Sequence, residues 1–391
     1  MRATTRLGWL VVAAVAPAAA QQASSDPVIA SFREYRAALE RNDLPAAERA
    51  AAAALAASEA ANGRRTGVLA LNLANVRLEL GPDYDALTPA STAHEHATAS
   101  ADSGVDPRTA SLTLGRAELA AGERAGSRRL IAAIPAAEGD SALAVDVYNA
   151  ATALGNWALE AQEFNTAETA WRTAERLAET AADPTFARAR ALTGLGVAIF
   201  LANANPQEQQ VGSRMRREST PEAQEAADAF LGARLLLWEA AYAEGPPGTS
   251  LTAGQAAFAQ AMAWHGALLA RLDSMDENRG FELPSNPSSR SIPVPDFDSH
   301  CSMSAFNTGP EIEYPTEALF RYGVGAVVMH FGLEPDGTVR SRTIAASIPP
   351  GPLAEAVEAT LDQWRIEKSS SSAPGCRIPP SFYFSVRFVL R

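Results

Sequence analysis

Three places in the 391-residue sequence hold residue types that could do chemistry. His94-Glu95-His96 offers two imidazoles and a carboxylate, which are the side chains that bind zinc. His300 precedes Cys301, and a histidine beside a cysteine can activate the thiol as a nucleophile. Cys301 and Cys376 are also the only two cysteines of the chain. Each chemistry requires a particular geometry from the elements that carry these residues.

The two histidine motifs lack that geometry in the sequence pattern. Residues two apart on a helix point to different sides, so His94 and His96 do not share a ligand position, and the stretch is not HExxH. A Cys–His nucleophile needs a third, orienting group and a cleft. No Walker loop, dinucleotide glycine fingerprint or GxSxG motif occurs. We therefore expect no enzyme activity, metal site, cofactor or small-molecule substrate.

The first twenty residues predict a signal peptide. Arg2 and Arg6 precede an apolar run over residues 7–20, which ends in three alanines of the kind that a signal peptidase accepts. The run is shorter than the roughly 20 residues of a membrane-spanning helix, and no later segment is expected to span. We predict cleavage before Gln21 and a periplasmic location. The alternative is an uncleaved anchor in the inner membrane.

Export also bears on the two cysteines and on the partners. An oxidising compartment would let Cys301 and Cys376 form a disulfide, with two unrelated thiols as the alternative. Two cysteines without patterned histidines are too few ligands for a zinc site. The net charge of −12 disfavours nucleic-acid backbones and anionic membrane surfaces as partners.

Residues 26–278 are predicted to form a helical-repeat array. Apolar residues, many of them alanine, recur at three and four positions. Four small residues lie in register at spacings of 41, 40 and 41 residues: Ala74, Gly115, Gly155 and Gly196. A fixed period in this range is typical of stacked helical repeats, and a small residue lets two helices approach closely.

One unit carries a family resemblance. The stretch ALGNWALEAQEFNTAETAWRTAERL resembles a tetratricopeptide repeat, with Gly155 in its first helix, Phe164 before the turn, and a second helix that carries Ala167, Trp171 and Ala174. The resemblance covers about residues 28–205, although the other units are degenerate and the period exceeds the roughly 34 residues usual for that family. It implies helix pairs that could hold a second protein.

The amino-acid composition changes after residue 278. Residues 279–310 are rich in Pro and Ser and predict a linker. Residues 311–391 predict a small α+β module in the order helix, strand, strand, helix, strand. Asp336-Gly337 is typical of a hairpin turn between the first two strands. An apolar stripe from Leu353 to Trp364 predicts the second helix, and residues 381–390 the last strand. We expect His265 to pack within a helix and His330 to point outward from its strand.

This module resembles the C-terminal domain of TonB-family energy transducers. The resemblance spans about 80 residues, and its matching points keep their order: Tyr314-Pro315, Ala318, Gly325, Val327-Val328, Phe331, Asp336-Gly337, Val339, Ser347, Ala356, Trp364-Arg365-Ile366 and Phe388. It implies a periplasmic domain that adds a strand from an outer-membrane receptor or another envelope protein to an exposed sheet edge. The edge implied here is the final strand, at Ser381, Tyr383, Ser385, Arg387 and Val389.

The chain also departs from that family. A typical transducer keeps its N-terminal anchor and has a long Pro-rich spacer, whereas this chain has a signal-like start and helical repeats. Three functions follow as expectations. The first is a periplasmic binding adaptor in TonB-dependent transmembrane transport. The second is an inner-membrane-anchored energy transducer. The third is a structural envelope scaffold without peptide binding.

Overall fold

The computed structural model describes residues 26–61, 63–181, 184–203, 221–242, 250–275, 300–315, 324–370 and 372–389. The predicted signal peptide, residues 279–299 of the predicted linker and the helix expected to follow Pro315 lie outside the described residues. The described part is mainly helical and ends in two small antiparallel sheets. Its contacts divide the chain into two compact units between Leu177 and Ala178.

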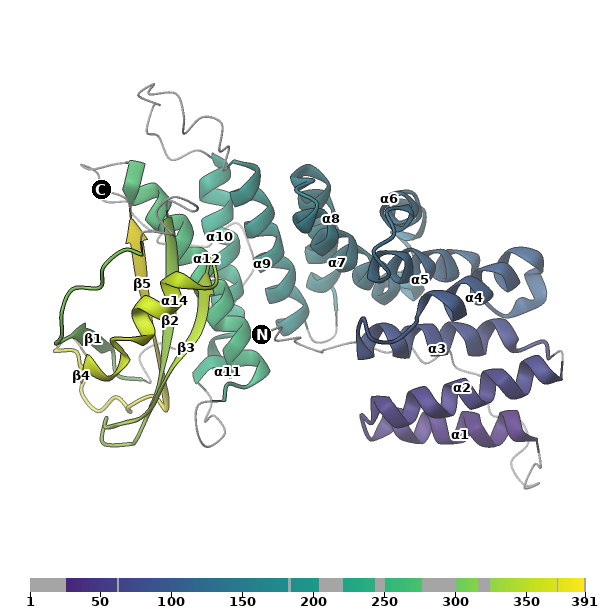
Figure 1. Cartoon of the computed structure of the whole chain (residues 1–391), viewed down its shortest axis with the longest axis horizontal. Helices are drawn as coiled ribbons and strands as arrows, with labels where there is room; N and C mark the ends of the chain where they lie inside the picture. Colours follow the sequence, from purple (N-terminus) through teal and green to yellow (C-terminus); the bar gives the residue numbers. More distant parts are fainter. Residues whose placement is uncertain are drawn as a thin grey trace. The chain divides into compact units, whose positions relative to one another are not determined.

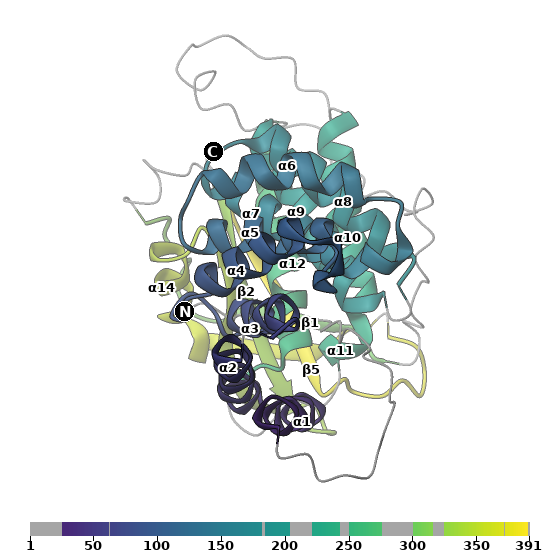
Figure 2. The ribbon, with the colours of Figure 1, turned by 90° about the vertical axis from the view of Figure 1, so that its right-hand side faces the viewer.

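The first unit is a succession of antiparallel helices (Figure 1). From α1 to α7 each helix packs against the next, and α3, α5 and α7 also pack in turn against one another. In Figure 2, α1 and α2 are seen nearly end-on and lie side by side. This architecture is repeat-like. The helices are α1 Pro27–Glu40, α2 Leu44–Ala60, α3 Thr66–Leu80, α4 Leu87–Ala99, α5 Pro107–Ala120, α6 Ala125–Ala137, α7 Ala144–Glu160 and α8 Phe164–Glu179.

Aspartate caps and prolines start several of these helices. The Asp26 side chain accepts a hydrogen bond from Val28 N, and Pro27 occupies the first helical position. Asp43 caps α2 and Asp106 caps α5 in the same way, again with proline in the first turn. The first backbone N–H groups of a helix have no partner within it. The aspartate side chain accepts a hydrogen bond from one of them, and proline at the first helical position has no N–H that needs a partner. Local sequence therefore fixes where these helices begin.

The in-register glycines lie where two helices approach most closely. A Cβ atom built on Gly115 of α5 would lie 2.5 Å from Leu130 of α6, and one on Gly155 of α7 would lie 2.7 Å from Trp171 of α8. In the second unit, a Cβ on Gly196 would lie 2.7 Å from Phe230. Each glycine thus accepts a large side chain from a neighbouring helix. Ala167, Trp171 and Ala174 of α8 are buried, as the tetratricopeptide resemblance implies.

We expect Gly155→Leu to lower the free energy of unfolding by roughly 1–3 kcal/mol, because the new side chain would overlap Trp171. Leucine is a better helix former than glycine, so helix propensity opposes this loss. Asn156→Leu, on the exposed neighbouring position, is the matched control and should change stability by less than about 0.5 kcal/mol. Urea unfolding measures both. Equal effects of the two substitutions would show that close helix approach at Gly155 is unimportant.

The second unit joins the last helices to the sheets (Figure 1). Among the described helices, only α9 is long and apolar enough to cross a membrane, judged by length and composition alone. The sequence analysis expected no such segment after the predicted signal peptide. Just over half of the apolar window of α9 is buried inside the protein, as in a core helix of a folded domain. The helices of this unit are α9 Thr185–Ala202, α10 Pro221–Leu236, α11 Trp238–Tyr242, α12 Ala253–Met275 and α14 Pro352–Glu358.

The larger sheet has three strands in the order β3-β2-β5, all antiparallel. Its hairpin turns at Gly337, whose φ of 90° suits the predicted Asp-Gly turn. The smaller sheet pairs β1 with β4. The strands are β1 Met303–Asn307, β2 Val324–Leu333, β3 Val339–Ile348, β4 Trp364–Lys368 and β5 Ser381–Val389.

Two predictions for this region are wrong. Met303–Asn307 falls within the predicted linker but forms β1 and pairs with β4. Trp364 begins β4 rather than ending a helix, since α14 stops at Glu358 and a short 3-10 turn, Leu361–Gln363, follows. The apolar stripe continued at helical spacing because Leu361 and Trp364 face the same core as Leu353 and Val357. The spacing of these apolar residues therefore indicated that they share a core, but it did not indicate that all of them are helical.

Both faces of the larger sheet are covered. On one face, Val327, Met329 and Phe331 pack against α14 and the β1–β4 ribbon. On the other face, α12 packs across β2, β3 and β5. Val328 and Tyr383 share one hydrophobic core with α9, α10 and α12. The other buried residues of this core are Ala189, Leu192, Ala229, Ala233, Leu237, Ala241, Phe258, Ala259, Ala261 and Ala263. Composition predicted a boundary at residue 278, but α12 and the sheet belong to one compact unit.

The covering helix also corrects the prediction for His330. The alternation of β2 does place this side chain on the face opposite Phe331, as predicted. That face lies beneath α12, so His330 is buried rather than outward in solvent. His265, on α12 itself, is packed in the core as expected.

Candidate functional site

Strand β5 forms one edge of the larger sheet. It pairs with β2 over nine residues without a register shift, from Ser381 opposite Gly332 to Val389 opposite Val324. Leu333 N donates to Pro380 O at 3.0 Å, which identifies the positions with even numbers as those whose main chain faces β2. The main-chain N–H and C=O groups at the odd positions therefore face away from β2.

These odd positions are the ones that the sequence analysis proposed as a peptide-binding edge. Among the described residues, the outward main-chain groups of Ser381, Tyr383 and Ser385 make no hydrogen bond to another segment. Arg387 and Val389 occupy the same side of the strand by register. An edge of this kind offers donors and acceptors at the spacing that another strand needs.

The opposite edge of the sheet is built differently. Strand β3 pairs with β2 with two register irregularities, one between Val328 and Met329 and one between Gly332 and Leu333. It also carries Arg340 and Arg342. Bulges and charges are the usual devices that prevent a sheet edge from accepting another strand. The two edges are therefore not equivalent, and β5 is the regular one.

The side chains of Ser381, Tyr383 and Ser385 on β5 point toward α12. Ser381 and Tyr383 are 1% and 4% exposed. A Cβ on Gly266 of α12 would lie 2.7 Å from Ser385 Oγ and 2.8 Å from Ala326 Cβ, so the glycine lets the helix lie close on the strands. These side chains are consequently occupied by the fold. What β5 presents at its free side is mainly backbone.

A polar network lies beneath α12. Gln255 Nε2 donates to Ser381 Oγ at 3.2 Å, and His330 Nε2 lies 3.1 Å from the same oxygen. The Tyr383 hydroxyl donates to Ala241 O at 3.2 Å. A serine–histidine pair could activate a nucleophile, but that chemistry needs an orienting group and access for substrate. His330 Nδ1 has no partner in the described part of the chain, and Ser381 is buried, so the described residues supply neither the orienting group nor the access.

Burial keeps two histidines neutral at this interface, His330 beneath α12 and His265 on α12 itself. Desolvation, followed by the charge of Arg340, lowers the pKa of His330 to about 4. Desolvation, followed by the charges of Arg234 and Arg387, lowers the pKa of His265 to about 3. Arg234 Nη1 lies 3.0 Å from His265 Nδ1, and because arginine can only donate, this imidazole nitrogen accepts. The interface therefore holds both imidazoles in their uncharged forms.

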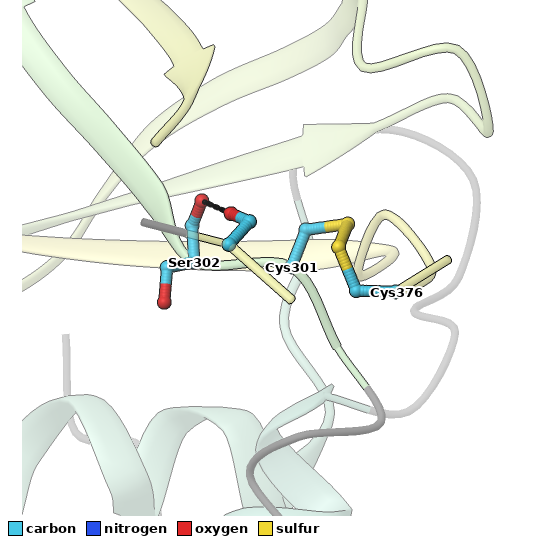
Figure 3. The surroundings of a disulfide bond; sticks show 4 residues. Cys301, Ser302 and Cys376 are labelled. Carbon is cyan, nitrogen blue, oxygen red and sulfur yellow. Dashed lines mark hydrogen bonds between the residues drawn. A yellow bond between two sulfur atoms is a disulfide. The ribbon is translucent and has the colours of Figure 1, made fainter. Parts of the chain in front are cut away.

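The disulfide between Cys301 and Cys376 is present, which confirms that prediction (Figure 3). Its Cα atoms are 4.9 Å apart, and it joins positions 75 residues apart in sequence. It ties the chain before β1 to the loop before β5. Because Cys301 is oxidised, it holds no thiolate, and the nucleophile considered for His300-Cys301 does not exist in this form.

The structure does not bring the other candidate residues into a site. His94 and His96 lie on α4, where His94 is half-buried and His96 is exposed. Burial lowers the pKa of His94, with the charge of Arg129 as the next cause. The described residues contain no group of three or more His, Cys, Asp or Glu side chains placed to hold a metal ion. The feature that sequence reasoning missed is the covering of the sheet by α12, and the close approach at Gly266 was its only signal.

Comparisons with known proteins do not assign a family: no protein-family model matches the chain, and no curated protein sequence matches it. The function must therefore be argued from the sheet edge and its surroundings.

Proposed function

We propose that this protein is a periplasmic binding adaptor whose strand β5 accepts an extended peptide by strand addition. The observation that carries the proposal is the asymmetry of the sheet. One edge runs for nine residues in unbroken register, and the other has two irregularities and two arginines. The backbone of Ser381, Tyr383 and Ser385 would supply most of the affinity, and no catalytic group is required.

The resemblance to the TonB C-terminal domain suggests the partner. It favours a periplasmic segment of an outer-membrane TonB-dependent receptor, or of another envelope protein, in TonB-dependent transport. The disulfide supports a location outside the reducing cytoplasm, because such bonds persist in oxidising compartments. The signal-like start of the sequence supports export to the periplasm. The helical units, with their tetratricopeptide-like residues, are proposed to hold a second protein.

Proline at Ser385 tests the edge without removing it. The N–H of this residue faces away from β2, so Ser385→Pro deletes one outward donor and leaves the β2–β5 ladder intact. We expect it to weaken peptide binding at least about fivefold, from one lost hydrogen bond and a steric barrier to pairing. Binding is measured by calorimetry on the exported full chain, with peptides copied from the N-terminal periplasmic segments of the receptors of the host.

Ser385→Ala is the matched control, because it keeps the N–H. The Ser385 hydroxyl is buried without a partner in the described structure, so its removal should leave stability and binding within about twofold of the native chain. Equal affinities of the proline and alanine variants would exclude strand addition at this edge. Failure of every receptor peptide to bind the native chain would favour the structural scaffold.

A further inference from the structure

The chain supplies its own short segment beside the residues that lead into β5. Cys301 N donates to Arg377 O at 2.8 Å, and His300 pairs with Arg377 in parallel. The disulfide fixes Cys301 to Cys376 (Figure 3). The carbonyl of Ser302 accepts from Ser369 N at 2.8 Å and from Ser372 Oγ at 2.9 Å. We call residues 300–302, held in this way, the clamp.

The carbonyls of Arg377 and Pro380 are three residues apart, and carbonyls at this separation point to opposite sides of an extended chain, which puts the clamp on the side of the free edge. The β2–β3 hairpin occupies the other side, because Leu333 N bonds Pro380 O. Ile378 also lies against the hairpin turn, 3.9 Å from a Cβ built on Gly337. The carbonyl of Arg377, which an incoming strand would otherwise meet, is already satisfied by Cys301. Among the described residues, the edge therefore has an occupied end before Ser381.

We infer that the clamp is a built end-stop that sets the register of the docked peptide. This inference rests on the proposed strand addition at β5. A peptide pairs along Ser381–Val389, a strand of nine residues, and cannot continue past Ser381. Pro379 lacks the N–H donor that further pairing would use, so it reinforces the same boundary. Specificity then depends on which residue of the partner lies against the clamp.

The test is a length series on the exported full chain. The tightest receptor peptide found as above is trimmed to nine residues and then extended by alternating Thr and Val at either end. A nitroxide on one terminus identifies, by its broadening of the Cys301 or Val389 amide signal in NMR, which end lies at the clamp. Calorimetry then gives Kd for each peptide. In the native chain we expect extension at the clamp end to change Kd less than about twofold.

Releasing the clamp should change that result. In the variant with both Cys301→Ala and Cys376→Ala, the disulfide no longer holds residue 301 beside Arg377, so an N–H of the longer peptide can displace the remaining backbone hydrogen bond to the Arg377 carbonyl. The same extension should then tighten binding about threefold to tenfold, the contribution of one or two backbone hydrogen bonds. A matched control peptide with proline at the added donor position should show no such gain.

The outcomes separate the two proposals. If the nine-residue peptide binds the native chain and extension of the peptide at the clamp end lowers Kd, the end-stop is overturned. Strand addition is unaffected by that result. No gain in a folded released variant overturns the role of the disulfide in the end-stop. No binding by any peptide overturns the proposed function and the end-stop together. If the released variant loses its NMR dispersion, the native series alone decides.

Discussion

A fragment of residues 300–391, cut at the linker, is expected not to fold as a stable domain. It would lose α12 and expose the sheet face that carries Val328, His330 and Tyr383, all of which are buried in the whole chain. A fully buried large apolar side chain contributes about 1.5–3 kcal/mol, and a typical domain has only about 5–15 kcal/mol in total. The loss of one entire covering helix is therefore comparable with the whole stability.

The measurement compares this fragment with residues 178–391, which form one compact unit. We expect the longer chain to unfold cooperatively and the shorter one to show poor NMR dispersion and to bind a hydrophobic dye. A cooperative unfolding of residues 300–391 at the same midpoint as the longer chain would show that α12 is dispensable. In that case the composition-based boundary at residue 278 would describe the protein better.

A point substitution tests the same interface in the full chain. Gly266→Leu places a side chain where only 2.7 Å separates a Cβ from Ser385 Oγ. The same Cβ would lie 2.8 Å from Ala326 Cβ of β2, so the leucine side chain would overlap both strands. We expect this variant to push α12 away from the sheet. Gln260→Leu, an exposed position on the same helix, is the control.

The second large effect is a loss of stability in mild acid. His330 and His265 have pKa values of about 4 and about 3 in the folded protein, against an ordinary value near 6.5, because both are buried. The folded state therefore binds fewer protons than the unfolded state below about pH 6.5. Stability should be highest above that pH and should fall as the pH drops toward about 4. At pH 5 the expected loss is about 2 kcal/mol for each histidine.

Urea unfolding at pH 7.5 and pH 5.0 measures this loss. Carboxylates also titrate below pH 5, so the test compares variants rather than conditions alone. His330→Asn keeps a polar group near Ser381 but cannot gain a proton in this range, and it should reduce the drop by about 2 kcal/mol. Gln260→Asn, at an exposed position of α12, changes no titratable group and should leave the drop unchanged. If His330→Asn loses as much stability in acid as the native chain does, burial of this imidazole is not the cause.

Much of the fold follows from local patterns in the sequence. The in-register glycines predicted the close helix approaches, because a position that faces Leu130 or Trp171 has no room for a Cβ. The disulfide was predicted from cysteine count and export. The parity of the last strand was readable as well, because Phe382, Phe384 and Phe388 had to face the core, which left the odd positions on the opposite side.

Apart from Gly266, nothing in the sequence indicated the docking of α12. An alanine-rich helix buried on several sides has no single apolar stripe, so its periodicity does not say which surface it covers. The sequence analysis did not predict strand β1, for a different reason. It has only five residues next to a Pro/Ser-rich stretch, and it is held by pairing with β4, which lies far along the chain. Non-local pairing of this kind overrides a weak local pattern.

The most direct test of the central claim is amide hydrogen exchange along β5 in the exported full chain, with and without a receptor peptide. Strand addition predicts that the outward N–H groups of Tyr383 and Ser385 exchange rapidly in the free protein and become protected on binding. The inward N–H groups of Phe382 and Phe384 should be protected in both states. Binding that protects other segments and leaves Tyr383 and Ser385 unchanged would contradict the account, because the peptide would then lie elsewhere.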